Sequence, residues 1–278
     1  MTLAAVAAGR DIVLEGPPGT SKTTMLNAIT EEWGIPLVFV EGNADLTPAK
    51  LVGHHNPARV LKEDYSPDNF VAGPLIEAMQ QGGFLYIEEF NRAPEDTLNT
   101  LLTAMADRAI AVPRVGTIVA APTFRVIASM NPYDNVGTTR LSTSVTDRLN
   151  RLSIDYQDAA SEEDIVTLRA LAAGALQERL VRDAVAVTRA TRVHPDVRQG
   201  SSVRGAIDTV LVATQLAQLR GLADDSAPAY PELVYDAMVV ALSGRIHLDE
   251  SIETTPERVL REIWEDHFIL LPAAAEPG

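Results

Sequence analysis

A glycine-rich segment that lies between a short apolar run and a helical pattern constrains this chain more than any other feature. The run at residues 12–15, IVLE, favours a buried strand, and TTMLNAITEEW, which starts at Thr23, has helical spacing. Between them, GPPGTSKT at residues 16–23 nearly matches the phosphate-binding pattern G-x-x-x-x-G-K-[ST]. Ser21 stands where that pattern has its last glycine. The order strand, loop, helix therefore predicts a loop that holds the phosphates of a nucleotide.

The residue types in this loop fit that chemistry. Glycines let the backbone curl, so that successive N–H groups and the N-terminus of the following helix face the phosphates. Lys22, one of three lysines in the chain, would neutralise the β- and γ-phosphates, and Thr23 would hold Mg²⁺. The alternative is a Pro-Gly turn beside a solvated lysine, which the flanking strand and helix disfavour. The predicted nucleotide-binding residues are Gly16, Pro17, Pro18, Gly19, Thr20, Ser21, Lys22, Thr23 and Thr24.

A second motif, FLYIEEF at residues 84–90, is an apolar strand that ends in two carboxylates. Placement at a strand end would aim both side chains at the phosphates on the loop. Glu88 would anchor the Mg²⁺ shell and Glu89 would polarise the attacking water, because these roles need adjacent acids that point in different directions. The alternative is a solvated strand edge.

The remaining patterns predict two domains. Strands at 12–15, 36–43, 84–90, 124–130 and 151–156 alternate with helical segments, including one near 141–149, and predict a five-stranded parallel α/β sheet with helices on both faces. A hairpin is expected within 109–121, with its turn at Val115 and Gly116. Helical patterns alone follow from Ser161, the expected N-cap. We expect an α/β domain at 1–157 and a small all-helical domain at 158–278.

Composition narrows the class of protein further. The chain has 278 residues, and 46% of them are hydrophobic. It has no cysteine, so disulfides, thiol nucleophiles and Cys-ligated metal sites are excluded. The cytoplasm is therefore the expected location. No apolar run approaches the ~20 residues of a membrane span. The net charge of -15 disfavours nonspecific DNA binding. The adjacent pair His54 and His55 lacks the partner spacing of a metal site.

Four segments, in this order and spacing, resemble the MoxR family of AAA+ ATPases: GPPGTSKT, LYIEEFNRAP, VIASMNP and GSSVRGA. DLTPAKLVG at 45–53, Gly73-Pro74 and residues 145–149 resemble further landmarks of that family. The resemblance implies a P-loop NTPase fold with a helical lid and Mg²⁺-dependent ATP hydrolysis in an oligomeric ring, often hexameric. It also implies the remodelling, maturation or activation of a partner protein, which in this family often carries a von Willebrand factor A domain.

The resemblance assigns three more site residues. Asn131 matches the sensor asparagine that binds the γ-phosphate or the attacking water, with an exposed Asn-Pro turn as the alternative. Arg204 matches the lid arginine that reads the γ-phosphate, with a surface helix arginine as the alternative. Arg148 matches the arginine inserted into the neighbouring subunit's site. Arg151 competes with it for that role, and a structural ion pair is the alternative for Arg148.

Three departures from the family pattern keep other functions open. Glu88 stands where relatives usually have Asp, which predicts slow hydrolysis, and Ser21 is a milder change. The chain begins only a few residues before its first strand, where relatives usually carry a helix that helps to enclose adenine. The alternatives are an ATP-binding structural switch with little turnover and, less favoured, a DNA-associated AAA+ motor. The sequence holds no N-K-x-D pattern, which disfavours a guanine-nucleotide switch.

Overall fold

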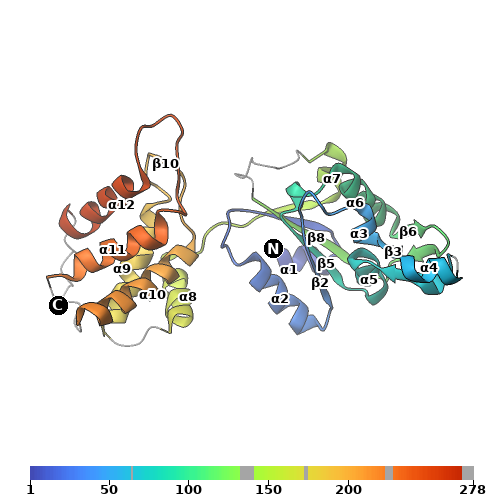
Figure 1. Ribbon diagram of the computed structural model, residues 1–278, viewed down its shortest axis with the longest axis horizontal. Coiled ribbons are helices and arrows are strands. Elements are labelled where there is room, and N and C mark those ends of the chain that lie inside the picture. Colours follow the sequence, from blue (N-terminus) through green and yellow to red (C-terminus); the bar gives the residue numbers. More distant parts are fainter. Residues whose placement is uncertain (64, 132–140, 172–174, 223–227, 271–278) are drawn as a thin grey trace. The chain divides into compact units, whose positions relative to one another are not determined.

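The computed structural model describes residues 1–270 apart from 64, 132–140, 172–174 and 223–227. The chain divides into two compact units (Figure 1). The first comprises Met1–Pro17 and Ser21–Asp155, and the second comprises Pro18–Thr20 and the residues from Tyr156 onward. Each unit contains buried apolar clusters of its own. In the described part of the chain, no helix is long and apolar enough to cross a bilayer.

A five-stranded parallel sheet forms the centre of the first unit, with strand order β2-β5-β8-β1-β9. The strands are β1 (Ile12–Glu15), β2 (Leu37–Glu41), β5 (Phe84–Glu88), β8 (Arg125–Met130) and β9 (Asn150–Ser153). This confirms the predicted α/β sheet. β5 is shorter than expected because Glu89 has a left-handed backbone, with φ 52°, and begins a 3₁₀ turn, η2 (Phe90–Arg92).

Helices cover both faces of this sheet (Figure 1). Successive strand residues point to opposite faces. On one face Leu14, Tyr86 and Ile127 share a core with α1 (Thr2–Ala7) and α2 (Lys22–Trp33). The sequence patterns do not predict α1. On the other face the strands pack against helices that follow β2, β5 and β8: α3 (Pro48–Val52), α5 (Pro74–Gln81), α6 (Glu95–Asp107) and α7 (Thr143–Arg148).

Two antiparallel pairs extend from the first unit. One joins β3 (Gly53–His55) to β4 (Phe70–Ala72), with α4 (Pro57–Glu63) and η1 (Pro67–Asn69) between them. The other is the expected hairpin, β6 (Ala109–Val112) and β7 (Gly116–Val119). The predicted turn is correct in part: Val115 lies in the turn at 113–115, and Gly116 has the expected positive φ, 111°. Gly116 already belongs to β7, however, and Arg114 within the turn also has a positive φ, 65°.

The second unit is mainly helical, with α8 (Ala159–Ala170), α9 (Ala175–Ala190), α10 (Val203–Arg220), α11 (Tyr230–Leu242), α12 (Pro256–Glu265) and a π turn, η3 (Asp266–Leu270). Two details correct the sequence prediction. Asp158 is the N-cap of α8, since its Oδ1 accepts the N–H of Ser161 at 2.8 Å. The unit also contains a short antiparallel pair, β10 (Val197–Gln199) and β11 (His247–Leu248).

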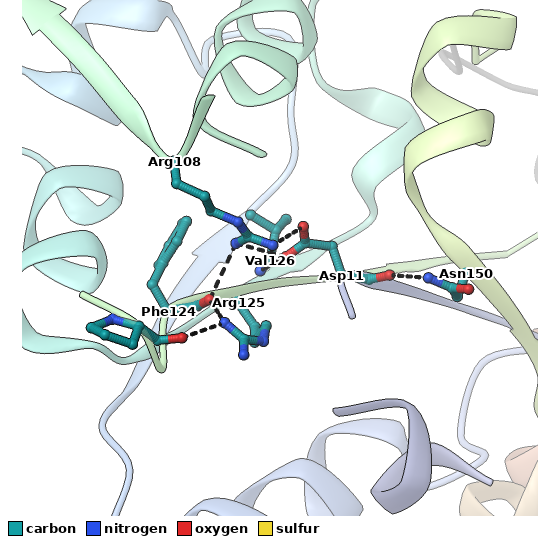
Figure 2. Close-up of polar contacts among 7 residues, drawn as sticks. Asp11, Arg108, Phe124, Arg125, Val126 and Asn150 are labelled. Atoms are coloured by element: carbon teal, nitrogen blue, oxygen red, sulfur yellow. Dashed lines mark hydrogen bonds and ion pairs between the residues drawn. The ribbon is translucent and has the colours of Figure 1, made fainter. Parts of the chain in front are cut away.

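A buried carboxylate joins the beginnings of three strands (Figure 2). Asp11, directly before β1, accepts the N–H of Val126 at 2.8 Å and Nη2 of Arg108 at 2.7 Å. Its main-chain carbonyl accepts the N–H of Asn150 at 2.9 Å. Arg108 also donates to the carbonyl of Phe124 at 3.2 Å. These bonds attach the starts of β1, β8 and β9 to the end of α6.

Burial is the main influence on the pKa of Asp11 and raises it above the ordinary 3.8, although the Val126 N–H and Arg108 oppose this. The folded chain therefore holds this proton more tightly than the unfolded chain. The contribution of Asp11 to the free energy of unfolding is full below pH 3.8 and falls as the pH rises through the raised pKa. We predict that the difference in unfolding free energy, wild type minus Asp11→Asn, decreases as the pH rises from 3.8 in urea titrations.

Asp11→Ala is the matched control, because it also removes the acceptor of the Val126 N–H. It should cost about 1–3 kcal/mol more than Asp11→Asn, the penalty of an unsatisfied buried donor. A wild-type minus Asn difference that grows with pH would show that Arg108 outweighs burial at this carboxyl group.

Candidate functional site

The predicted phosphate loop connects β1 to α2. A Cβ atom on Gly16 would overlap the carbonyl oxygen of Ile154, so only glycine fits where the loop leaves the sheet. Ser21, the N-cap of α2, has φ 59°. This left-handed backbone explains why glycine is usual at that position and shows that serine adopts the same turn here. Lys22 Nζ donates to the carbonyls of Gly16 at 3.0 Å and Pro17 at 2.8 Å, which holds the ammonium group over the loop.

The two acidic residues at the end of β5 differ in backbone conformation. Glu88 is the last residue of the strand, whereas the left-handed backbone of Glu89 turns the next side chain away from the strand direction. Glu89 forms an ion pair with Arg92 at 3.1 Å, and both side chains are partly exposed. The sequence reasoning overlooked Arg92, although its i,i+3 spacing is a signal for such a pair.

Parallel pairing brings the motifs to one edge of the sheet. Glu15 is opposite Met130 in the β1–β8 register, and the Gly16 N–H donates to the Met130 carbonyl at 3.2 Å. Asn131, the predicted sensor, follows Met130 directly. Since β8 also pairs with β5, the phosphate loop, Asn131 and Glu88 all follow the carboxyl ends of neighbouring strands.

A buried tyrosine connects the loop to these strands. Tyr86 of β5 is fully buried, and its hydroxyl lies 3.2 Å from Thr23 Oγ1 and 3.0 Å from Ser129 Oγ. Burial raises the pKa of Tyr86 above its usual range, and the negative charge of Glu88 raises it further, against the two hydrogen bonds. The phenol therefore keeps its proton at neutral pH. Sequence reasoning overlooked Tyr86 and Ser129, because they read as ordinary strand residues.

The two arginines considered for action across a subunit boundary differ in their contacts. Arg151 of β9 forms an ion pair with Glu15, a residue that is 8% exposed at the end of β1. Arg148 is exposed at the end of α7, where Nη1 donates to the Ser144 carbonyl at 3.1 Å within the same helix. Arg151 is thus held within its own unit, which favours Arg148 for the role in trans.

The remaining candidates lie away from this edge or in the second unit. Arg204 is an exposed residue in the first turn of α10, two residues after the N-cap Ser202. The ring of His55 packs edge-on against Tyr65 and Phe70. Among the described residues, no group of three or more His, Asp or Glu side chains is arranged to hold a metal ion.

Thr23 and Glu88 fit the way proteins bind Mg²⁺ with a nucleotide. This ion usually takes one or two carboxylates and completes its shell with phosphate oxygens and water. The Thr23 hydroxyl lies 3.2 Å from the Tyr86 hydroxyl, and Glu88 stands two residues after Tyr86 at the end of the same strand. A hydroxyl and a carboxylate are donors of the kind that Mg²⁺ shares with phosphate oxygens and water.

Comparison with known proteins decides the family. Residues 11–149, half of the chain, match the family described as AAA domain (dynein-related subfamily). This chain belongs to that AAA family. The match begins at Asp11 and ends at Leu149, so it includes the loop, both carboxylates, Asn131 and Arg148. The prediction of an AAA+ ATPase is confirmed.

Similar proteins agree with this placement. The Gas vesicle ATPase GvpN of Ancylobacter aquaticus is 28% identical over 83% of this chain, which spans 67% of that protein. Gas vesicle ATPase GvpN1 of Halobacterium salinarum is 28% identical over 84% of this chain, which spans 76% of it. The structure of NtrX from Brucella abortus in complex with ADP has a TM-score of 0.55 to this AAA chain and 23% sequence identity. The match covers 95% of this chain and 58% of the NtrX chain. The similarity to NtrX concerns the fold alone.

Lys22→Ala tests the assignment of the loop. We expect roughly 10²-fold weaker ATP binding by calorimetry, because the phosphates lose charge-assisted hydrogen bonds worth about 3 kcal/mol. The matched control is Lys50→Ala, which removes a lysine of α3 and should leave ATP affinity unchanged. Unchanged affinity in a folded Lys22→Ala chain would contradict the assignment.

Proposed function

We propose that this AAA+ chain binds ATP with Mg²⁺ at the carboxyl edge of its sheet and hydrolyses it. The observation that carries the proposal is the pair Glu88 and Glu89 at the end of β5, on the edge that also bears the phosphate loop. One carboxylate continues the strand and the next is turned by a left-handed residue, so the two can serve different atoms.

The loop residues bind and orient the triphosphate. Gly16, Pro17 and Pro18 shape the start of the loop, and the backbone N–H groups of residues 19–24 at the N-terminus of α2 supply the donors for the phosphate oxygens. Lys22 exchanges its two loop carbonyls for β- and γ-phosphate oxygens. Thr23 and Glu88 would hold Mg²⁺, which would supply positive charge to offset that of the triphosphate. Asn131 orients the γ-phosphate or the attacking water.

Glu89 activates the water that attacks the γ-phosphorus. As the new P–O bond forms, the water transfers a proton toward the Glu89 carboxylate, and the bond from the γ-phosphorus to the bridging oxygen breaks, which leaves ADP and phosphate. The Arg92 ion pair restrains the position of the Glu89 carboxylate. Arg148 from a neighbouring subunit stabilises the charge that develops on the γ-phosphate. By resemblance, Arg204 is proposed as the arginine that reads the γ-phosphate.

We propose further that the chain is MoxR-like and forms a ring, hexameric by resemblance, in the cytoplasm. Its ATP cycle would remodel, mature or activate a partner protein, and a protein with a von Willebrand factor A domain is the proposed companion. The sequence landmarks support this, as does the similarity to gas vesicle ATPases over more than four fifths of the chain.

An ATP-binding switch with little turnover is the second candidate, and Glu88 is the observation that favours it. Glutamate has one methylene more than the aspartate usual in the family, which would displace the Mg²⁺ shell and slow hydrolysis. Steady-state phosphate release separates the two functions. A DNA motor is disfavoured by the net charge of -15, and a salt-dependent DNA titration tests it.

Glu89→Gln separates binding from chemistry. Glutamine keeps the shape of the side chain but does not take a proton, so ATP should bind at near wild-type affinity while phosphate release falls by about 10²- to 10⁴-fold. Glu89→Gln also weakens the ion pair with Arg92, so Arg92→Ala is the control that removes this ion pair and keeps the Glu89 carboxylate. Arg92→Ala should retain more activity than Glu89→Gln. Wild-type turnover by Glu89→Gln would move the activating role to Glu88.

Arg148→Ala should bind ATP almost normally and hydrolyse it poorly, since an arginine supplied in trans is worth roughly 10³- to 10⁵-fold in rate. Mixing gives the sharper test. Glu89→Gln subunits have an intact Arg148, and Arg148→Ala subunits have an intact site, so mixed rings contain complete interfaces and should regain phosphate release. If rings mix and no ratio restores activity, Arg148 does not act in trans.

A further inference from the structure

The Tyr86 hydroxyl is a buried polar group beside the proposed site. Tyr86 and Ser129 are 0% and 1% exposed, and the cluster around them is made of apolar side chains such as Leu26, Phe84 and Ile127. A hydroxyl in such surroundings is costly unless it is hydrogen-bonded. The phenylalanine ring alone would fill the same space, so the hydroxyl oxygen needs a separate explanation.

The two partners of this hydroxyl belong to different elements. Thr23, 3.2 Å away, is the predicted metal ligand in the first turn of α2. Ser129, 3.0 Å away, lies in β8 two residues before Asn131. The three hydroxyls therefore form a continuous chain from the phosphate loop to the strand that carries the predicted sensor.

The direction of hydrogen bonding in this chain follows from what a metal needs. A hydroxyl that ligates a cation uses an oxygen lone pair and keeps its proton, which the cation makes more acidic and a stronger donor. Thr23 would then donate to Tyr86, and Tyr86 to Ser129. In this arrangement the Thr23 proton points into the core and its lone pairs remain available on the phosphate side.

We infer that Tyr86 is a positioning residue, which holds the Thr23 hydroxyl in its metal-binding orientation through the Thr23–Tyr86–Ser129 chain. The inference rests on the proposed MgATP site. Tyr86 contacts neither the nucleotide nor the metal in this role. It reduces the number of orientations open to the Thr23 hydroxyl before the metal arrives.

The test is the Mg²⁺ dependence of Tyr86→Phe, which removes one oxygen and keeps the ring. In the absence of Mg²⁺, with chelator present, ADP affinity should equal that of wild type. The Mg²⁺ concentration for half-maximal phosphate release should rise about 2- to 10-fold, the effect of one lost hydrogen bond, whereas kcat at saturating Mg²⁺ should recover to within about 2-fold. The Mg²⁺-induced gain in ADP affinity, measured by calorimetry, should shrink by the same factor.

Ser129→Ala is the matched control, because it also removes one hydroxyl from the chain but leaves the Tyr86–Thr23 bond in place. Its Mg²⁺ dependence should shift less than that of Tyr86→Phe. In a Thr23→Ala background, Tyr86→Phe should produce no further shift in Mg²⁺ dependence, since the hydroxyl that it positions is gone.

Three results would overturn the inference: a folded Tyr86→Phe chain with wild-type Mg²⁺ dependence, equal shifts in Tyr86→Phe and Ser129→Ala, or loss of the folded state on removal of the phenol oxygen. The last would make the hydroxyl a structural requirement. Failure of the proposed function is recognised separately, because wild-type chain would then show no Mg²⁺-dependent gain in nucleotide affinity.

Discussion

In-register parallel pairing of β5, β8 and β1 is the constraint on which the site depends. Parallel strands end together, so segments far apart in sequence leave the sheet at one edge. The Gly16 N–H extends the β1–β8 ladder to Met130, and the Gly42 N–H donates to the Glu88 carbonyl at 2.7 Å on the other side of β5. A Cβ on Gly42 would overlap the Glu89 carbonyl, so glycine is required for this close approach. A shift of one residue in either pairing would separate the phosphate loop from the carboxylates.

Buried polar groups tie the sheet together at two levels. Asp11 joins the amino ends of β1, β8 and β9 to α6, and Tyr86 joins the middle of β5 to β8 and α2. Each group is costly to bury and is satisfied by partners from other elements, so each one favours a single register over its neighbours. The strands that carry the proposed chemistry are thus specified by polar contacts as well as by apolar packing.

The motifs and their local structure could be predicted from the sequence because they depend on neighbouring residues. The strand at 12–15, the loop and the helix after it follow from composition and spacing, and a serine at position 21 is tolerated because it adopts a left-handed backbone. Local signals were insufficient where two residues compete. Asp158 and Ser161 are both good caps, and only the geometry of the turn selects Asp158.

Features that depend on contacts between distant residues could not be predicted from the sequence. The partners of Tyr86 are 63 and 43 positions away, and a tyrosine within an apolar strand gives no sign of either. The short pair β10–β11 has too few residues to show alternation. The sequence also left Arg151 as a competitor of Arg148, and its ion pair with Glu15 is visible only in the structure.

The most direct measurement is steady-state phosphate release by the unmodified chain across a range of protein concentrations, with Mg²⁺ and with a chelator. A site completed by a neighbour's arginine predicts Mg²⁺-dependent release that saturates with ATP, and a rate per chain that rises with protein concentration as subunits associate. Saturable ATP binding without phosphate release above background at any concentration would contradict hydrolysis at this site.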